Sequence, residues 1–162
     1  MATVQIQFIG CDAAPFSTTP LNEEPPFRVR ILYPTGKGIT PDKYTGPIIH
    51  ELSHVYQLKH AGSYKRLQDS LDNSNERIEM GADFLAGLVI RKLGLDPSVF
   101  EGSDYLTGNY HPSAPDSHGL PPDRSAAFEY GYQSESTKCL DSQYTYFQDN
   151  DFARIKNSNV VN

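Results

Sequence analysis

The residues of this chain most capable of chemistry are two histidines and a glutamate in one short stretch, His50-Glu51-Leu52-Ser53-His54. Residues four apart lie on one face of a helix, so His50 and His54 could bind the same metal ion. Glu51 would then lie beside the metal, where its carboxylate could take a proton from water. This HExxH spacing is typical of zinc hydrolases that cut peptide bonds. The alternative is an amphipathic helix whose histidines have no chemical role.

Two histidines do not hold zinc tightly, so a catalytic site needs a third protein ligand and an open fourth position. Glu79 and Asp83 offer one solution, because they share a face of a second expected helix. One carboxylate could then reach the metal while the other holds the tautomer of a ligating histidine. Glu76 lies near the same face and is a second candidate, although no acid follows it four residues later. A solvated acidic helix face is the alternative without chemistry.

His60 is the third candidate ligand, six residues after His54, which is the spacing of the metzincin proteases. That family has a glycine three residues after the second histidine, where the chain turns back to the metal. Gln57 stands at this position here and resists a positive φ angle. If the helix continues, His60 lies out of reach of a metal bound by His50. We therefore expect zinc as the metal, with a glutamate of the second helix, Glu79 or Glu76, as the favoured third ligand.

A third segment, His118-Gly119-Leu120-Pro121-Pro122-Asp123-Arg124, adds to these two motifs. It resembles the HGxxxxR element of the bacterial neutral zinc metallopeptidases, which are gluzincin-type enzymes, and a related element of the CAAX-prenyl-protease group. With the HExxH and ExxxD motifs, the resemblance covers about residues 46–134. It implies a zincin-like fold in which Glu79 binds zinc and Asp83 hydrogen-bonds a ligating histidine. It also implies that the histidine and arginine of the third segment lie beside the metal.

These assignments predict a zinc-dependent endopeptidase. The metal would lower the pKa of a bound water from about 15.7 toward ~7, and Glu51 would serve as general base and then general acid. His118, or else Tyr110 or His111, would stabilise the oxyanion of the tetrahedral intermediate. Arg124 would either orient the two carboxylates of the second helix or contact the substrate carbonyl.

The sequence pattern predicts two strands and three helices that must position these residues. The strands are expected at 4–9 and 27–33, and the helices from Pro41 or Pro47 to about 59, from a cap at 73–75 to Leu93, and over 121–132. Glycines 81 and 87 predict close packing of the second helix. Segments 13–26 and 102–120 are expected to be loops, and the tail after residue 148 to be frayed. The expected fold class is α+β: zincin-like, mostly helical, with a small N-terminal β-sheet.

Substrate, partners and alternatives follow from the same features. Strand 27–33 precedes the motif helix and is expected at a sheet edge, where an extended peptide could pair with it. The net charge of −6 and the lack of a dense Lys/Arg cluster argue against nucleic acid or an anionic membrane as partner. A peptide or protein substrate is therefore expected. Two other functions stay open: a metzincin-type protease that uses His60, and a non-catalytic metal-binding interaction module, against which Glu51 argues.

Chain length and apolar pattern indicate the number of domains and the localisation of the protein. The 162 residues suit one metallopeptidase-like domain spanning 1–162. No apolar run approaches the length of a membrane span, and the N-terminus lacks the layout of a signal peptide. We expect a soluble, cytoplasmic protein, with signal-independent secretion still open. The oligomeric state is open too, and Cys11 and Cys139 could be free thiols or one long-range bridge.

Overall fold

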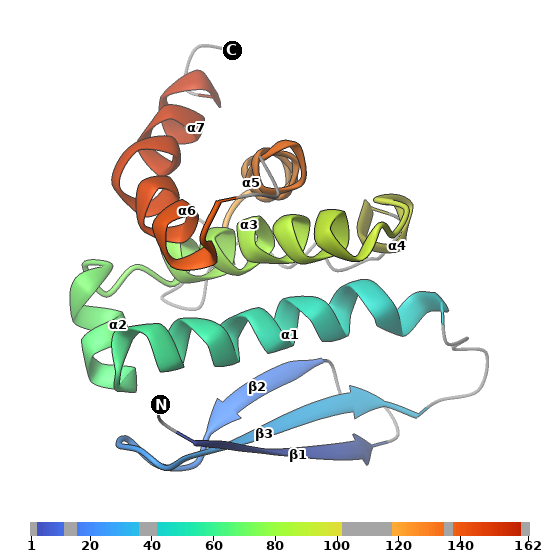
Figure 1. Cartoon of the computed structure of the whole chain (residues 1–162), viewed down its shortest axis with the longest axis vertical. Coiled ribbons are helices and arrows are strands. Elements are labelled where there is room, and N and C mark those ends of the chain that lie inside the picture. The colour runs from blue at the N-terminus through green and yellow to red at the C-terminus, as the bar shows by residue number, and fades with distance from the viewer. Residues whose placement is uncertain (1–2, 12–15, 36–41, 102–117, 135–137, 160–162) are drawn as a thin grey trace.

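The structure, a computed structural model, is an α+β arrangement in layers (Figure 1). It describes residues 3–11, 16–35, 42–101, 118–134 and 138–159, without the side chains of residues 42, 43, 101 and 159. A small N-terminal sheet forms the first layer, and one long helix lies on it. A second long helix lies on the far side of the first, and the C-terminal helices cover that second helix. The expected α+β class is confirmed.

Three strands form the sheet, with the third strand in the centre. They are β1 (Val4–Cys11), β2 (Ser17–Pro20) and β3 (Phe27–Pro34), in the order β1-β3-β2. β1 runs parallel to β3, and β2 runs antiparallel to it. The prediction that strand 27–33 lies at a sheet edge is wrong, because β1 and β2 flank it on both sides. The short edge strand β2 lies in segment 13–26, for which the sequence predicts only a loop.

Helices make up nearly all of the described chain after residue 41. They are α1 (Asp42–Ala61), α2 (Tyr64–Ser70), α3 (Asn75–Leu93), α4 (Ser98–Glu101), α5 (Pro121–Gln133), α6 (Leu140–Tyr146), the π-helical turn η1 (Phe147–Asp151) and α7 (Phe152–Asn159). The three predicted helices correspond to α1, α3 and α5 and are confirmed. α3 begins after Ser74, whose side chain accepts a hydrogen bond from the Arg77 N–H, and ends at Gly94, where φ is 66°.

Helix α1 is fixed on the sheet by its apolar face. The alternating side chains of Phe27, Val29 and Ile31 on β3 are fully buried. They form one cluster with Val55 and Leu58 of α1. An adjacent face of α1, about a quarter-turn around the helix, packs against α3 and carries the two histidines of the HExxH motif.

Helices α3 and α5 cross with their backbones in close contact. A Cβ on Gly87 would overlap the Phe128 carbonyl, and a Cβ on Gly131 would overlap the Phe84 carbonyl. Both glycines are therefore required for the crossing, which confirms the predicted close packing of Gly87. The crossing brings the start of α5 against the middle of α3.

Residues 149–159 are helical and packed, so the prediction that the tail after residue 148 is frayed is wrong for this described part. Ile155 of α7 is buried in the same cluster as residues of α3 and α5. Lys156 forms salt bridges with Glu76 at 2.6 Å and with Asp123 at 2.7 Å. One buried apolar residue and one bridging cation hold α7 in place although its sequence is mostly polar.

The state of the two cysteines and the presence of membrane-spanning helices can be read from the structure. Cys11 and Cys139 are exposed, free thiols, so the alternative of a long-range bridge is not the one formed. Among the described residues, no helix has the length and apolar character needed to cross a bilayer.

Candidate metal centre

Helices α1 and α3 lie side by side and bring together two histidines and one glutamate, His50, His54 and Glu79, called here the His–His–Glu cluster. The two Nε2 atoms are 3.1 Å apart. Glu79 places Oε2 3.2 Å from Nε2 of His50 and Oε1 3.5 Å from Nε2 of His54. His50 is buried, whereas the side chains of His54 and Glu79 are 16% and 15% exposed, so the cluster is buried at His50 and partly exposed at the other two residues.

The spacing of the cluster fits a tetrahedral metal ion. Ligand atoms about 2.0–2.1 Å from a tetrahedral zinc ion lie about 3.3–3.4 Å from one another. The Nε2–Nε2 separation of 3.1 Å and the 3.2 Å between Nε2 of His50 and Oε2 of Glu79 lie close to that value, whereas the 3.5 Å contact of His54 is made by the other carboxylate oxygen, Oε1. One atom from each of the three residues is available as a ligand. Two imidazoles and a carboxylate suit zinc and also other divalent transition metals, so the ligand set alone does not select zinc.

His50 is held by a buried ionic pair. Its Nδ1 lies 2.8 Å from Oδ1 of Asp83. Arg124 donates two hydrogen bonds to the same carboxylate, at 2.7 Å from Nε and 2.9 Å from Nη2. Since Nδ1 is engaged by Asp83, the lone pair of Nε2 is directed into the cluster. Nη2 of Arg124 also lies 3.8 Å from Glu79, so Arg124 takes the predicted position beside the two carboxylates.

The charges around the cluster favour a bound cation. Burial lowers the pKa of His50, but Asp83 and Glu79 outweigh burial and raise that pKa to about 9. Burial raises the pKa of Glu79, yet the two imidazoles hold it well below the usual range. A metal ion would displace the protons that raised pKa values keep on the two imidazoles, and the carboxylates of Glu51, Glu79 and Asp83 would then exceed the guanidinium of Arg124 by two negative charges. A divalent cation would neutralise that excess.

His54 is held by an uncharged side chain, Gln57. Nδ1 of His54 lies 2.9 Å from Oε1 of Gln57. The amide nitrogen of Gln57 donates to the Ile78 carbonyl at 2.8 Å and lies 3.1 Å from the Tyr144 hydroxyl. The sequence analysis missed this role of Gln57. Its position three residues after His54, on the same helix face, was the available signal.

Glu51 is buried and contacts the edge strand β2. The hydroxyl of Thr18 donates to Oε2 of Glu51 at 2.6 Å and lies 3.1 Å from the carbonyl oxygen of the same residue. Burial lowers the pKa of His54, but the net shift is upward because Glu79 raises it. The negative charge of Glu51 adds a smaller contribution in the same direction as Glu79. Thr18 was also missed, because the sequence predicts a loop where β2 is found.

The two competing ligand candidates lie elsewhere. Helix α1 continues unbroken through His60, which is about 9 Å farther along the helix axis than His54. Nδ1 of His60 lies 3.4 Å from Asp141 instead. Glu76 accepts a hydrogen bond from Lys156 at 2.6 Å. The rotation of α3 about its axis therefore directs Glu79, and not Glu76, toward the histidines.

Of the three predicted oxyanion donors, the described residues include only His118. His118 is exposed, and within the described parts of the chain no hydrogen bond or ion pair joins it to the cluster. Gly119, the next residue, packs beside Glu76 and Arg124. Tyr110 and His111 lie outside the described residues. The oxyanion role of these three side chains stays a prediction.

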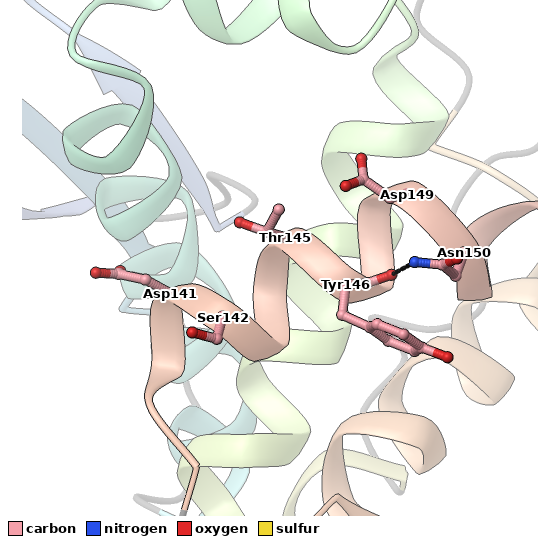
Figure 2. Close-up of a pocket in the computed structure, with 6 residues that line it drawn as sticks. All are labelled: Asp141, Ser142, Thr145, Tyr146, Asp149 and Asn150. Carbon is pink, nitrogen blue, oxygen red and sulfur yellow. Dashed lines mark hydrogen bonds between the residues drawn. The ribbon is translucent and has the colours of Figure 1, made fainter.

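A shallow hollow on the outer surface of α6 and η1 is separate from the cluster (Figure 2). Its lining residues are Asp141, Ser142, Thr145, Tyr146, Asp149 and Asn150. Figure 2 shows their side chains spread along the outside of the helix, with the Asn150 amide bonded to the Tyr146 carbonyl. None of these residues belongs to the cluster or supports it, and we assign the hollow no role in the chemistry.

Comparison with protein-family models, with curated proteins and with solved structures finds no match to this chain. The resemblance of the three sequence motifs to bacterial neutral zinc metallopeptidases therefore stays a prediction. Function must be inferred from the arrangement of the residues themselves.

Proposed function

We propose that this chain is a zinc-dependent endopeptidase of the gluzincin type. The observation that carries the proposal is the convergence of Nε2 of His50, Nε2 of His54 and a carboxylate oxygen of Glu79. The other nitrogen of each imidazole already faces an acceptor, which leaves Nε2 for the metal. Three protein ligands suit a catalytic zinc site, because a structural site normally has four.

The side chains around the cluster have distinct roles in the proposed reaction. Zinc held by the His–His–Glu cluster would supply Lewis acidity and would lower the pKa of a water molecule to about 7. Glu51 would accept a proton from water on its carboxylate and later deliver it to the leaving amine. Thr18 donates to Oε2 of Glu51 and so restricts the movement of that carboxylate. Asp83 and Arg124 keep His50 oriented.

The strand β2 is the expected place for a peptide substrate. It is an edge strand, and Thr18 in its second position touches Glu51 directly. An extended peptide that adds to a sheet edge forms backbone hydrogen bonds along the strand. A peptide on β2 would therefore run past the general base. This position replaces β3, which the sequence analysis considered and which lies inside the sheet.

A comparison of Glu51→Gln with the unaltered protein tests catalysis separately from metal binding. Zinc content is measured by elemental analysis, and cleavage by mass spectrometry of a mixed peptide library. We expect Glu51→Gln to retain zinc and to cleave roughly 10²–10⁴-fold more slowly, the usual contribution of a general base. Glu129→Gln, which changes an exposed glutamate of α5, is the matched control and should retain both properties.

The ligand assignment is tested with two further variants. Loss of zinc from Glu79→Ala but not from His60→Ala is the expected result. The reverse result would support a metzincin-type site, and full zinc content in both variants would refute both ligand assignments. Zinc binding without cleavage of any peptide by the unaltered protein would indicate a metal-binding interaction module instead of an enzyme.

A further inference from the structure

His54 contacts a network of uncharged hydrogen-bonding groups, and this network determines which nitrogen of the imidazole carries the hydrogen. Gln57 is fully buried at its centre. The network joins α1 to α3 through the Ile78 carbonyl and to α6 through the Tyr144 hydroxyl. Gln148 of η1 extends it, because its amide nitrogen lies 3.3 Å from the same Tyr144 hydroxyl.

The amide of Gln57 can face His54 in only one orientation. The Ile78 carbonyl is an acceptor alone, so the group 2.8 Å from it must be the amide nitrogen. The amide oxygen then lies 2.9 Å from Nδ1 of His54. A hydrogen bond to that oxygen requires a hydrogen on Nδ1. In the neutral ring the lone pair is then on Nε2, the atom that faces His50 and Glu79.

Helix α3 leaves room for this amide by having a glycine beside it. A Cβ on Gly81 would overlap the side-chain nitrogens of both Gln57 and Gln148. Any other residue at this position would force the side-chain ends of Gln148 and Gln57 to shift. The close packing predicted for Gly81 is therefore packing against Gln57, the side chain that contacts His54.

We propose that Gln57 is a positioning residue that holds His54 as the Nδ1–H tautomer and directs Nε2 at the metal. The proposal rests on the zinc-binding part of the proposed function. It adds a residue on the His54 side whose role corresponds to that of Asp83 on the His50 side. The Ile78 carbonyl keeps the Gln57 amide from turning over, and the Tyr144 hydroxyl accepts a further hydrogen bond from its nitrogen.

Two variants separate this role from a general contribution to packing. Gln57→Leu removes the acceptor at similar size. Gln148→Leu is the matched control, because it removes a buried amide of the same network that does not touch His54. We expect Gln57→Leu to bind zinc about 10–100-fold more weakly, the usual effect of losing a partner of a ligating histidine. The Gln148→Leu variant should bind zinc nearly as tightly as the unaltered protein.

Proton NMR of the zinc-loaded protein supplies a readout that packing alone would not change. Hydrogen-bonded imidazole N–H protons give separate low-field signals for His50 and His54. Gln57→Leu should remove the His54 signal and leave the His50 signal, which serves as internal control because its partner is Asp83. Unchanged affinity and both signals in Gln57→Leu would overturn the proposal. Equal weakening of zinc binding in Gln148→Leu would overturn it as well.

Failure of the proposed function would give a different result. If the unaltered protein binds no zinc, the metal site is wrong, and the role of Gln57 is judged on the metal-free protein. There, loss of the His54 signal in Gln57→Leu supports the positioning role, and its persistence refutes it.

Discussion

The two histidines of the cluster are supported in opposite ways. His50 is held by a charged pair, Asp83 with Arg124, in which every member is nearly or fully buried. His54 is held by a neutral amide, Gln57, which depends on a carbonyl and a hydroxyl. Charge-assisted hydrogen bonds are roughly twice as strong as neutral ones. We therefore expect the His50 side to be the more rigid and the more sensitive to substitution.

The two supports also come from different parts of the tertiary structure. Both use α1 and α3, but the charged support is completed by Arg124 at the start of α5, and the neutral one by Tyr144 of α6. Each histidine thus depends on a different C-terminal helix. A substitution on one side of the cluster can therefore loosen one histidine while the other histidine stays in place.

The largest effect is expected from Arg124→Leu, which breaks the charged support. The variant leaves the buried Asp83 without its guanidinium, and loss of one partner of a buried pair costs about 3–5 kcal/mol of unfolding free energy. Urea denaturation of the metal-free protein measures this cost. Lys65→Met, which removes one partner of an exposed pair with Asp69, is the control and should unfold like the unaltered protein. An unchanged midpoint for Arg124→Leu would show that the charged pair contributes no stability.

An intermediate effect is expected from Asp83→Asn, which tests the ranking of the two supports. The substitution keeps the size of the side chain but removes the charge that faces His50 and Arg124. Zinc affinity, measured by competition with a chelator, should fall about 10–100-fold and by more than in Gln57→Leu. Asp149→Asn, at an exposed position of η1, should bind zinc normally. A larger loss in Gln57→Leu than in Asp83→Asn would reverse the comparison.

The smallest effect is expected from Tyr144→Phe, which weakens the neutral support indirectly. The hydroxyl contacts Gln57 and not the histidine, and a typical hydrogen bond contributes about 0.5–1.5 kcal/mol. Zinc affinity should therefore fall by less than it does in Gln57→Leu. Tyr146→Phe removes the hydroxyl of an exposed tyrosine of the same helix and is the matched control. Identical affinities for the two tyrosine variants would mean that Tyr144 does not stabilise the Gln57 amide.

Elements with strong local signals were predicted well. Helix α3 follows Ser74 and ends before Gly94, as the cap residues indicated, because caps act on backbone groups within a few residues. The strand β2 was missed, since four residues in a proline-rich segment carry little pattern of their own and pair only because β3 lies beside them. The C-terminal helices were missed for a related reason. Their apolar residues, Phe147 and Ile155 among them, are few and are buried by α3 and α5.

The sequence by itself determined which side chains share a helix face. Periods of three and four residues place His50 with His54 and Glu79 with Asp83, and this periodicity is a property of the helix alone. Only the tertiary structure decided that Glu79 faces the histidines while Glu76 pairs with Lys156. The physical reason is that α3 takes its rotation about its own axis from packing against α1 and α5, through contacts between residues far apart in sequence.

Of the two residues that hold the histidines, one was predictable from the sequence and the other was decided by the tertiary structure. The sequence placed Asp83 in reach of a ligating histidine, because the ExxxD spacing is local. The acceptor of His54 was decided by tertiary structure, since the Gln57 amide is oriented by the carbonyl of Ile78, 21 residues away, and by Tyr144, 87 residues away. A side chain that can donate or accept takes its role from the partner it meets, and only the packed structure supplies that partner.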